Sequence, residues 1–298
     1  MEKQKNNNYV FFTDTDTDLT PEIAAKYGYK LISMPYSIGD EETFPYVDFD
    51  KFNAHEFYDK LRKGTMPTTS ALSPAAYEEY FEPYFKEGKD VLYVHFSRAM
   101  SGTFNALNLA VESLKEKYQE RTLYTVDTKG ITISSYNINC EIGDLYLQGK
   151  SIEEILEWAE TEVDKFAIYF FANDLSFFSR SGRVKAFTAF MGNILGIRPI
   201  INMGEDGMMC SVDKARGLKG TLDKIVGYVD ALQDDIKGHR VIVGHSDALE
   251  NARILADKLK EKFGDDLNIE FVEVNPTAGS HCGPDGVGVC FHAKRRNL

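Results

Sequence analysis

The stretch DVLYVHFSRAMSGTFNALNLAVESLKEKY (residues 90–118) joins a strand pattern to a helix pattern through a short polar loop. The run DVLYVHF is rich in β-branched and aromatic residues, as in a buried strand. Apolar residues then recur every three or four positions, as on one face of a helix (Phe104, Leu107, Val111, Leu114 and Tyr118). The stretch therefore predicts α/β architecture, with Ser101, Gly102 and Thr103 where strand passes to helix.

The same alternation of strand and helix extends along the chain. Further strand-like runs are YVFFTD (9–14), YKLISMPYSI (29–38), RTLYTVD (121–127), FAIYFFAN (166–173), HRVIVGH (239–245) and NIEFVEV (268–274). Helix start signals stand between them, at Ser73 with Pro74 and at Ser151 with Glu154. The pattern predicts largely parallel α/β sheets, with a binding site at the carboxyl ends of the strands.

The length of 298 residues fits two domains of modest size or one large domain. The clearest break lies near 148–165, where Gly149 and an acidic helix pattern separate two blocks of strands. We therefore predict a polar, disordered tail at 1–8, an N-terminal α/β domain over 9–160 and a C-terminal α/β domain over 161–298. Whether the last segments pack back on the first domain is left open.

Charge and composition narrow the class of protein. The net charge of −12 argues against binding nucleic acid, because such proteins gather positive charge on one face. No apolar run approaches the roughly 20 residues of a membrane span, and the start MEKQKNNN has no apolar signal core. The four cysteines have no C-x-x-C spacing and are expected to be reduced thiols. We expect a cytoplasmic protein.

Three loops rich in hydroxyl groups or glycine could bind an anion. The first holds Ser101 and Gly102 at a helix start, where backbone N–H groups attract negative charge. The second is PTTSALSP (67–74), and the third is TAGSHCGPDGVGV (277–289), interpreted as a loop after a strand, with His281 as a possible donor. Helix capping by Ser101, turn chemistry at 67–74 and an incidental histidine explain the same residues without a ligand.

Basic side chains gather in one part of this acidic chain, within SRSGRV (179–184), GNILGIRPI (192–200) and DKARG (213–217). They are Arg180, Arg183, Arg198, Lys214 and Arg216, together with Lys185, which directly follows the first stretch. Such a group forms either a solvated basic face or a surface that meets a phosphate or an acidic partner.

The stretch DTDTD (14–18) follows the first strand and allows a second class of function. A strand followed by D-x-D is similar to magnesium-dependent phosphotransferases of the haloacid-dehalogenase type, in which the first aspartate, here Asp14, is the nucleophile. Asp18 stands where that pattern has threonine or valine, and the acidic pair Asp234 and Asp235 lacks a preceding strand. Aspartate residues that form a turn or cap a helix explain the stretch DTDTD equally well.

Taken in order, nine stretches resemble the DegV family of bacterial fatty-acid-binding proteins. They are FFTDTDTDL (11–19), PTTSALSP (67–74), SRAMSGTFNA (97–106), VDT (126–128), SRSGRV (179–184), LGIRPII (195–201), KARG (214–217), GH (244–245) and SHCGPDGVGV (280–289). The resemblance implies two α/β domains with mainly parallel sheets and a lipid pocket between them. It also implies a carrier rather than an enzyme, which presents a long-chain fatty acid to an ATP-dependent fatty acid kinase and so supplies phospholipid precursors.

The resemblance assigns roles to residues of this sequence. It places the fatty acid carboxylate on Thr69, Ser101 and His281, with Ser70 and Gly102 beside them. It places Arg180, Arg183 and Arg216 on a rim toward the kinase and the acyl phosphate. No catalytic residue, metal or cofactor other than the bound fatty acid is implied, and transient contact with a membrane surface is left open.

Two departures from the family pattern affect these expectations. Tyr136 stands where the family usually has a small residue, so its bulk could alter the space for the lipid tail. Asp285 stands in place of a glycine and, if close to His281, would either raise the pKa of the imidazole or repel the ligand. Two alternatives stay open: a magnesium-dependent phosphotransferase using Asp14 and Asp16, and a serine acyl hydrolase using Ser101 and His281.

Overall fold

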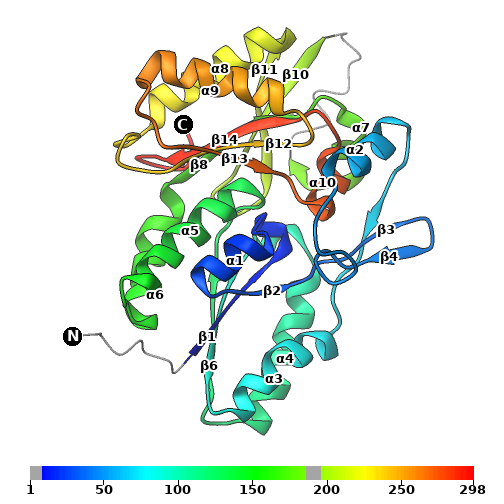
Figure 1. Ribbon diagram of the computed structural model, residues 1–298, viewed down its shortest axis with the longest axis vertical. Coiled ribbons are helices and arrows are strands. Elements are labelled where there is room, and N and C mark those ends of the chain that lie inside the picture. Colours follow the sequence, from blue (N-terminus) through cyan, green and yellow to red (C-terminus); the bar gives the residue numbers. More distant parts are fainter. Residues whose placement is uncertain (1–8, 186–195) are drawn as a thin grey trace.

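The computed structural model describes residues 9–185 and 196–298, so the tail predicted at 1–8 lies outside the described residues. Strands and helices alternate as expected, and the strands form three sheets (Figure 1). Of the helices within the described ranges, none has the length and apolar character that a membrane span needs.

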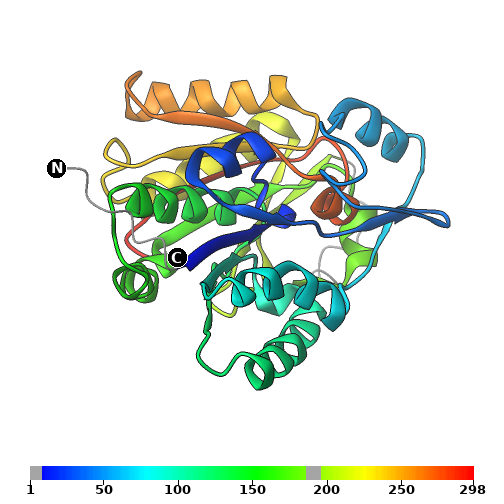
Figure 2. The same ribbon diagram turned by 60° about the horizontal axis from the view of Figure 1, so that its bottom comes forward.

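The four-stranded sheet is parallel throughout and has the order β2-β1-β6-β7. Its strands are β1 (Tyr9–Asp14), β2 (Lys30–Ile32), β6 (Asp90–His95) and β7 (Leu123–Asp127). Helices α3 (Pro74–Lys86) and α4 (Thr103–Lys117) pack together on one side, while α1 (Pro21–Tyr27) packs against α5 (Ile133–Leu147) on the other (Figures 1 and 2). Both faces are therefore covered, as parallel sheets require.

The seven-stranded sheet has the order β13-β12-β14-β8-β10-β11-β9. Its strands are β8 (Phe166–Phe171), β9 (Val184–Lys185), β10 (Ile197–Met203), β11 (Met209–Arg216), β12 (Val241–His245), β13 (Ile269–Glu273) and β14 (Val287–His292). Helices α8 (Gly217–Leu232) and α9 (Leu249–Phe263) cover one face, and α5 packs against the other (Figure 1). This sheet differs from the parallel expectation, because four of the six pairings among its described strands are antiparallel.

A small antiparallel sheet stands beside the two larger ones. It consists of β3 (Tyr36–Ile38), β4 (Glu41–Thr43) and β5 (Thr68–Thr69), and it lies near α2 (Ala54–Arg62) and α10 (Pro276–Cys282). The run 29–38, expected to be one strand, is divided between β2 and β3. Pro35 explains the break, because it has no backbone N–H to continue the ladder.

The segment TAGSHCGPDGVGV is not one loop: a helix ends at Cys282, a short loop spans 283–286, and a strand begins at Val287, so the interpretation as a single loop is wrong. Asn275 caps α10 by accepting a hydrogen bond from the Ala278 N–H, and Pro276 occupies the first turn. The part 287–292 is the strand β14, which lies inside the seven-stranded sheet and pairs with β12 and β8. His281 is therefore held on a helix.

The expected helix starts at Ser73 and Ser151 are confirmed, with a capping box between Ser151 and Glu154. The largest apolar cluster runs without a break from the four-stranded sheet through α5 to β8 and β10. The smaller clusters lie between the seven-stranded sheet and helices α8 and α9, and around α2. The division into domains near residue 160 stays a prediction, because this core is continuous there.

Candidate functional site

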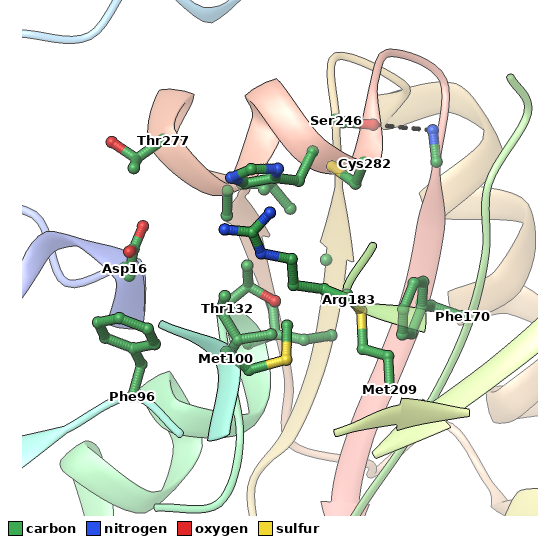
Figure 3. Close-up of a pocket in the computed structure, with 18 of the residues that line it drawn as sticks. Asp16, Phe96, Met100, Thr132, Phe170, Arg183, Met209, Ser246, Thr277 and Cys282 are labelled. Carbon is green, nitrogen blue, oxygen red and sulfur yellow. Dashed lines mark hydrogen bonds between the residues drawn. The ribbon is translucent and has the colours of Figure 1, made fainter. Parts of the chain in front are cut away.

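A pocket lies where the carboxyl ends of β1 and β6 meet the face of the seven-stranded sheet. The space bounded by its lining residues, including the part open to solvent, is about 1040 Å³. Its wall is mainly apolar and sulfur-containing (Phe96, Met100, Ile168, Phe170, Phe178 and Met209; Figure 3). The pocket thus lies at the carboxyl ends of strands, where the sequence predicts a binding site.

Polar side chains from three separate segments line the same pocket. Thr69 comes from β5, Ser101 from the loop before α4, and His281 from α10. Thr69 Oγ1 lies 2.9 Å from His281 Nε2, a hydrogen bond whose donor depends on the imidazole tautomer. Ser101 Oγ accepts a hydrogen bond of 3.2 Å from the Thr103 N–H. The structure therefore brings these three predicted residues together at one cavity.

The two residues expected beside them differ in placement. Ser70 lines the pocket, but its hydroxyl donates a 2.6 Å hydrogen bond to Glu42 Oε1. Gly102 is the residue before the first turn of α4, is exposed, and does not contribute to the described lining. Its place agrees with a helix start, while direct contact with a ligand stays a prediction.

The imidazole of His281 is neutral at neutral pH. Burial lowers its pKa to about 4, and the positive charges of Arg183 and Arg180 act in the same direction. A neutral imidazole carries one N–H donor and one acceptor nitrogen, and Thr69 occupies Nε2. His281 can therefore hold a polar group by hydrogen bonding, without a charge of its own.

The three predicted arginines do not form one cluster. Arg183 lines the pocket and donates to the Ser181 carbonyl, and Arg180 donates to the carbonyls of Met66 (3.3 Å) and Pro67 (2.7 Å). Arg216 is exposed at the end of β11, seven positions beyond the pocket residue Met209. At about 3.3 Å per strand residue, Arg216 lies about 23 Å along the strand from Met209.

Asp14 and Asp18 are buried, and each uses one carboxyl oxygen in hydrogen bonds while the other oxygen has no partner among the described residues. Asp14 accepts hydrogen bonds from the Tyr93 hydroxyl (2.9 Å) and the Phe96 N–H (3.2 Å), and burial raises its pKa to about 7. Asp18 accepts from the backbone N–H (2.9 Å) and side-chain Nδ2 (2.7 Å) of Asn275, and burial raises its pKa to about 8. Such carboxyl groups are poorly placed as ionised nucleophiles.

Asp16, in contrast, lines the pocket. Within the part of the chain that the structure describes, no group of three or more His, Cys, Asp or Glu side chains is arranged to hold a metal ion. The burial and hydrogen bonds of Asp14 do not favour a phosphotransferase that uses this residue as its nucleophile. A serine hydrolase is also not favoured, because His281 Nε2 bonds to Thr69 and the low pKa of His281 makes it a weak base.

The two residues that depart from the family pattern, Tyr136 and Asp285, each bond to a residue outside the described pocket lining. Tyr136 is buried in α5 with its hydroxyl on Glu270, and it is not part of the described pocket lining, so the expected effect on the tail is not seen. The Asp285 carboxylate pairs with Arg62 at 2.7 Å, and Asp285 is not among the causes of the His281 pKa shift. Asp285 therefore does not raise the pKa of His281. It is also not among the described residues that line the pocket.

Several lining residues could not be recognised in the sequence. Ile168 and Phe170 of β8 line the pocket, but an apolar residue in a strand gives the same sequence pattern whether it faces a core or a cavity. Thr132 lines the pocket with a φ of 51°, which is unusual for a β-branched residue. No local pattern marks that conformation.

Comparison with known proteins identifies similar chains. The family model described as "Uncharacterised protein, DegV family" matches residues 10–294. A DegV domain-containing protein of Clostridium perfringens is 30% identical over 284 residues, covering 95% of this chain and 97% of that protein.

Solved structures share the fold. A DegV family protein from Ruminococcus gnavus, refined with vaccenic acid, has a TM-score of 0.81 and 23% identity, covering 95% of this chain and 99% of that chain. A stearic-acid-binding protein from Eubacterium ventriosum has a TM-score of 0.85 and 19% identity, covering 96% and 98%. At these identities the likeness establishes the fold.

Proposed function

Because this chain belongs to the DegV family, we propose that it binds a long-chain fatty acid in the pocket between its two larger sheets. Thr69, Ser101 and His281 hold the carboxylate, and the apolar wall encloses the tail. The observation that carries the proposal is the pocket itself, in which hydroxyl and imidazole groups from three segments adjoin a wall of aromatic, aliphatic and thioether side chains. The fatty acids bound to the R. gnavus and E. ventriosum proteins support it.

The chemistry of the pocket suits both ends of such a ligand. Burying each methylene contributes about 0.8 kcal/mol, so a tail of roughly sixteen carbons offsets a considerable ordering cost. The carboxylate needs several donors, since a buried unpaired charge is expensive. Ser101, the first turn of the 15-residue helix α4 and the guanidinium of Arg183 provide donors and positive charge there.

The proposal describes a carrier rather than a hydrolase, and mass spectrometry tests it. We expect an organic extract of the purified protein to contain about one long-chain fatty acid per chain, with no mass added to the protein. A Ser101→Ala variant is expected to bind oleate more weakly by about 1–3 kcal/mol, because a charged acceptor loses a donor. A covalent acyl group on Ser101, or equal thermal stabilisation of parent and variant by oleate, would contradict the proposal.

We further propose that the bound lipid is presented to an ATP-dependent fatty acid kinase, with Arg180 and Arg183 beside the carboxylate and Arg216 at a more distant contact. An acyl phosphate is a dense anion, and guanidinium groups are its preferred partners. The support is the position of Arg183 in the pocket lining and its effect on His281.

Charge reversal tests the arginine rim. We expect Arg183→Glu to reduce acyl phosphate formation by a purified fatty acid kinase and ATP at least tenfold per bound oleate, because a like charge faces the phosphate. The matched control is Arg253→Glu on α9, where Arg253 is exposed and pairs only with Glu250 among the described residues. Unchanged phosphorylation by Arg183→Glu would show that Arg183 has no part in the transfer.

A further inference from the structure

Asp16 is a polar group in the pocket that the proposed head-group contacts do not use. It is 6% exposed, lines the pocket, and its Oδ1 has no hydrogen-bond partner among the described residues. Figure 3 shows the Arg183 side chain extending across the pocket toward the side on which Asp16 lies. A buried polar atom without a partner is costly, and one that faces a binding cavity is satisfied when a ligand supplies the partner.

The position of Asp16 is at the head-group end of the pocket. The turn Thr15–Thr17 that carries it packs against α10, and Asn275 at the start of α10 binds Asp18. Thr277 and His281 both line the pocket and stand four residues apart on α10, so they share one face of that helix. Asp16 and the Thr69–His281 pair therefore border the same end of the cavity.

The surroundings favour the protonated form of Asp16. Burial, followed by the like charges of Asp14 and Asp18, raises its pKa well above the ordinary value. From other elements, His281, which is neutral at neutral pH, and the cation Arg183 line the same pocket. Cys282 of α10 also lines the pocket as a thiol, because burial raises its pKa to about 12.

We propose that Asp16 binds the fatty acid as a neutral carboxylic acid, so that its O–H donates to the ligand carboxylate beside Arg183 and the two carboxyl groups share one proton. This inference rests on the proposed function and adds a fourth head-group contact. No covalent bond changes: the ligand enters as an anion and Asp16 keeps its proton. One guanidinium then balances one anion, whereas an ionised Asp16 would leave two carboxylates around that guanidinium.

The shared proton makes binding depend on pH. Once the pH exceeds the pKa of Asp16 in the free protein, binding requires Asp16 to take up a proton. The Kd then rises by up to tenfold per pH unit until the pH reaches the pKa of Asp16 in the complex. The substitution Asp16→Asn supplies an N–H donor at the same place, and this donor is present at every pH of the experiment. Asp16→Ala removes the donor altogether.

The test measures the Kd of palmitate from pH 6 to pH 9.5 by isothermal titration calorimetry, with the NMR shift of [1-¹³C]palmitate reporting the charge of the bound head group. For the parent we expect Kd to rise across this range. For Asp16→Asn we expect a flat profile, and for Asp16→Ala a Kd at least tenfold higher at pH 6. His281 and Cys282 titrate outside this window.

Asp18→Asn and Asp14→Asn are the matched controls, because both carboxyl groups are buried in the same segment and neither lines the described pocket. Both titrate within the window. Each variant is expected to keep a rise of Kd with pH, displaced toward lower pH because one like charge beside Asp16 is removed. A parent Kd independent of pH, together with unchanged binding by Asp16→Ala, would overturn the role of Asp16. A parent that binds no palmitate at any pH would overturn the proposed function itself.

Discussion

Replacing Arg296 with methionine is expected to lower the free energy of unfolding by about 3–5 kcal/mol. Arg296 is 2% exposed and donates to the carbonyls of Lys129, Thr128 (3.1 Å) and Val163 (2.6 Å). Methionine retains an apolar stem but leaves these carbonyls without their donor, and each unsatisfied buried group costs about 1–3 kcal/mol. Urea unfolding monitored by circular dichroism measures the change.

The neighbouring Arg295 provides the control, because it is the same residue type and is exposed. Arg295→Met is expected to change stability by less than about 0.5 kcal/mol. Arg296 also ties the C-terminal segment to the loop that precedes the pocket residues Ile131 and Thr132. Equal stability of the two variants would show that this buried guanidinium does not hold that loop.

The second large effect concerns Asp14 and the pH dependence of stability. The folded pKa of Asp14 is raised from 3.8 to about 7, so between these values the unfolded chain releases a proton that the folded chain retains. The Asp14 carboxyl group therefore stabilises the folded state at pH 4, and this contribution to the free energy of unfolding is lost as the pH rises toward 7. The difference corresponds to about 4 kcal/mol, and Asp16 and Asp18, whose pKa values are also raised, act in the same direction.

Asp14→Asn is expected to remove about 4 kcal/mol of the decline in unfolding free energy between pH 4 and pH 8. The amide oxygen can still accept from the Tyr93 hydroxyl and the Phe96 N–H, so the local hydrogen bonds are preserved. Urea unfolding at several pH values checks this, with Asp265→Asn as an exposed control. A decline as steep in Asp14→Asn as in the parent would contradict the assignment.

Local patterns were enough to predict much of the fold. The strand at 90–96 and the helix after it appear as β6 and α4, and the start signals at Ser73 and Ser151 are used as expected. The prediction was poorer where glycine or proline dominates. Pro35 divides one expected strand, and the segment after Pro284 contains β14, an inner strand whose pairing comes from β8 and β12.

The order and local spacing of residues along the chain were enough to assign the α/β class, the family, and a set of polar residues that includes Thr69, Ser101 and His281. Which of these residues share a cavity depends on how distant segments pack together. Burial and neighbouring charge are properties of the folded environment, and they made His281 neutral, raised the pKa of Asp16 and separated Arg216 from the pocket. Antiparallel pairing in the larger sheet was likewise fixed by long-range contacts that no single segment encodes.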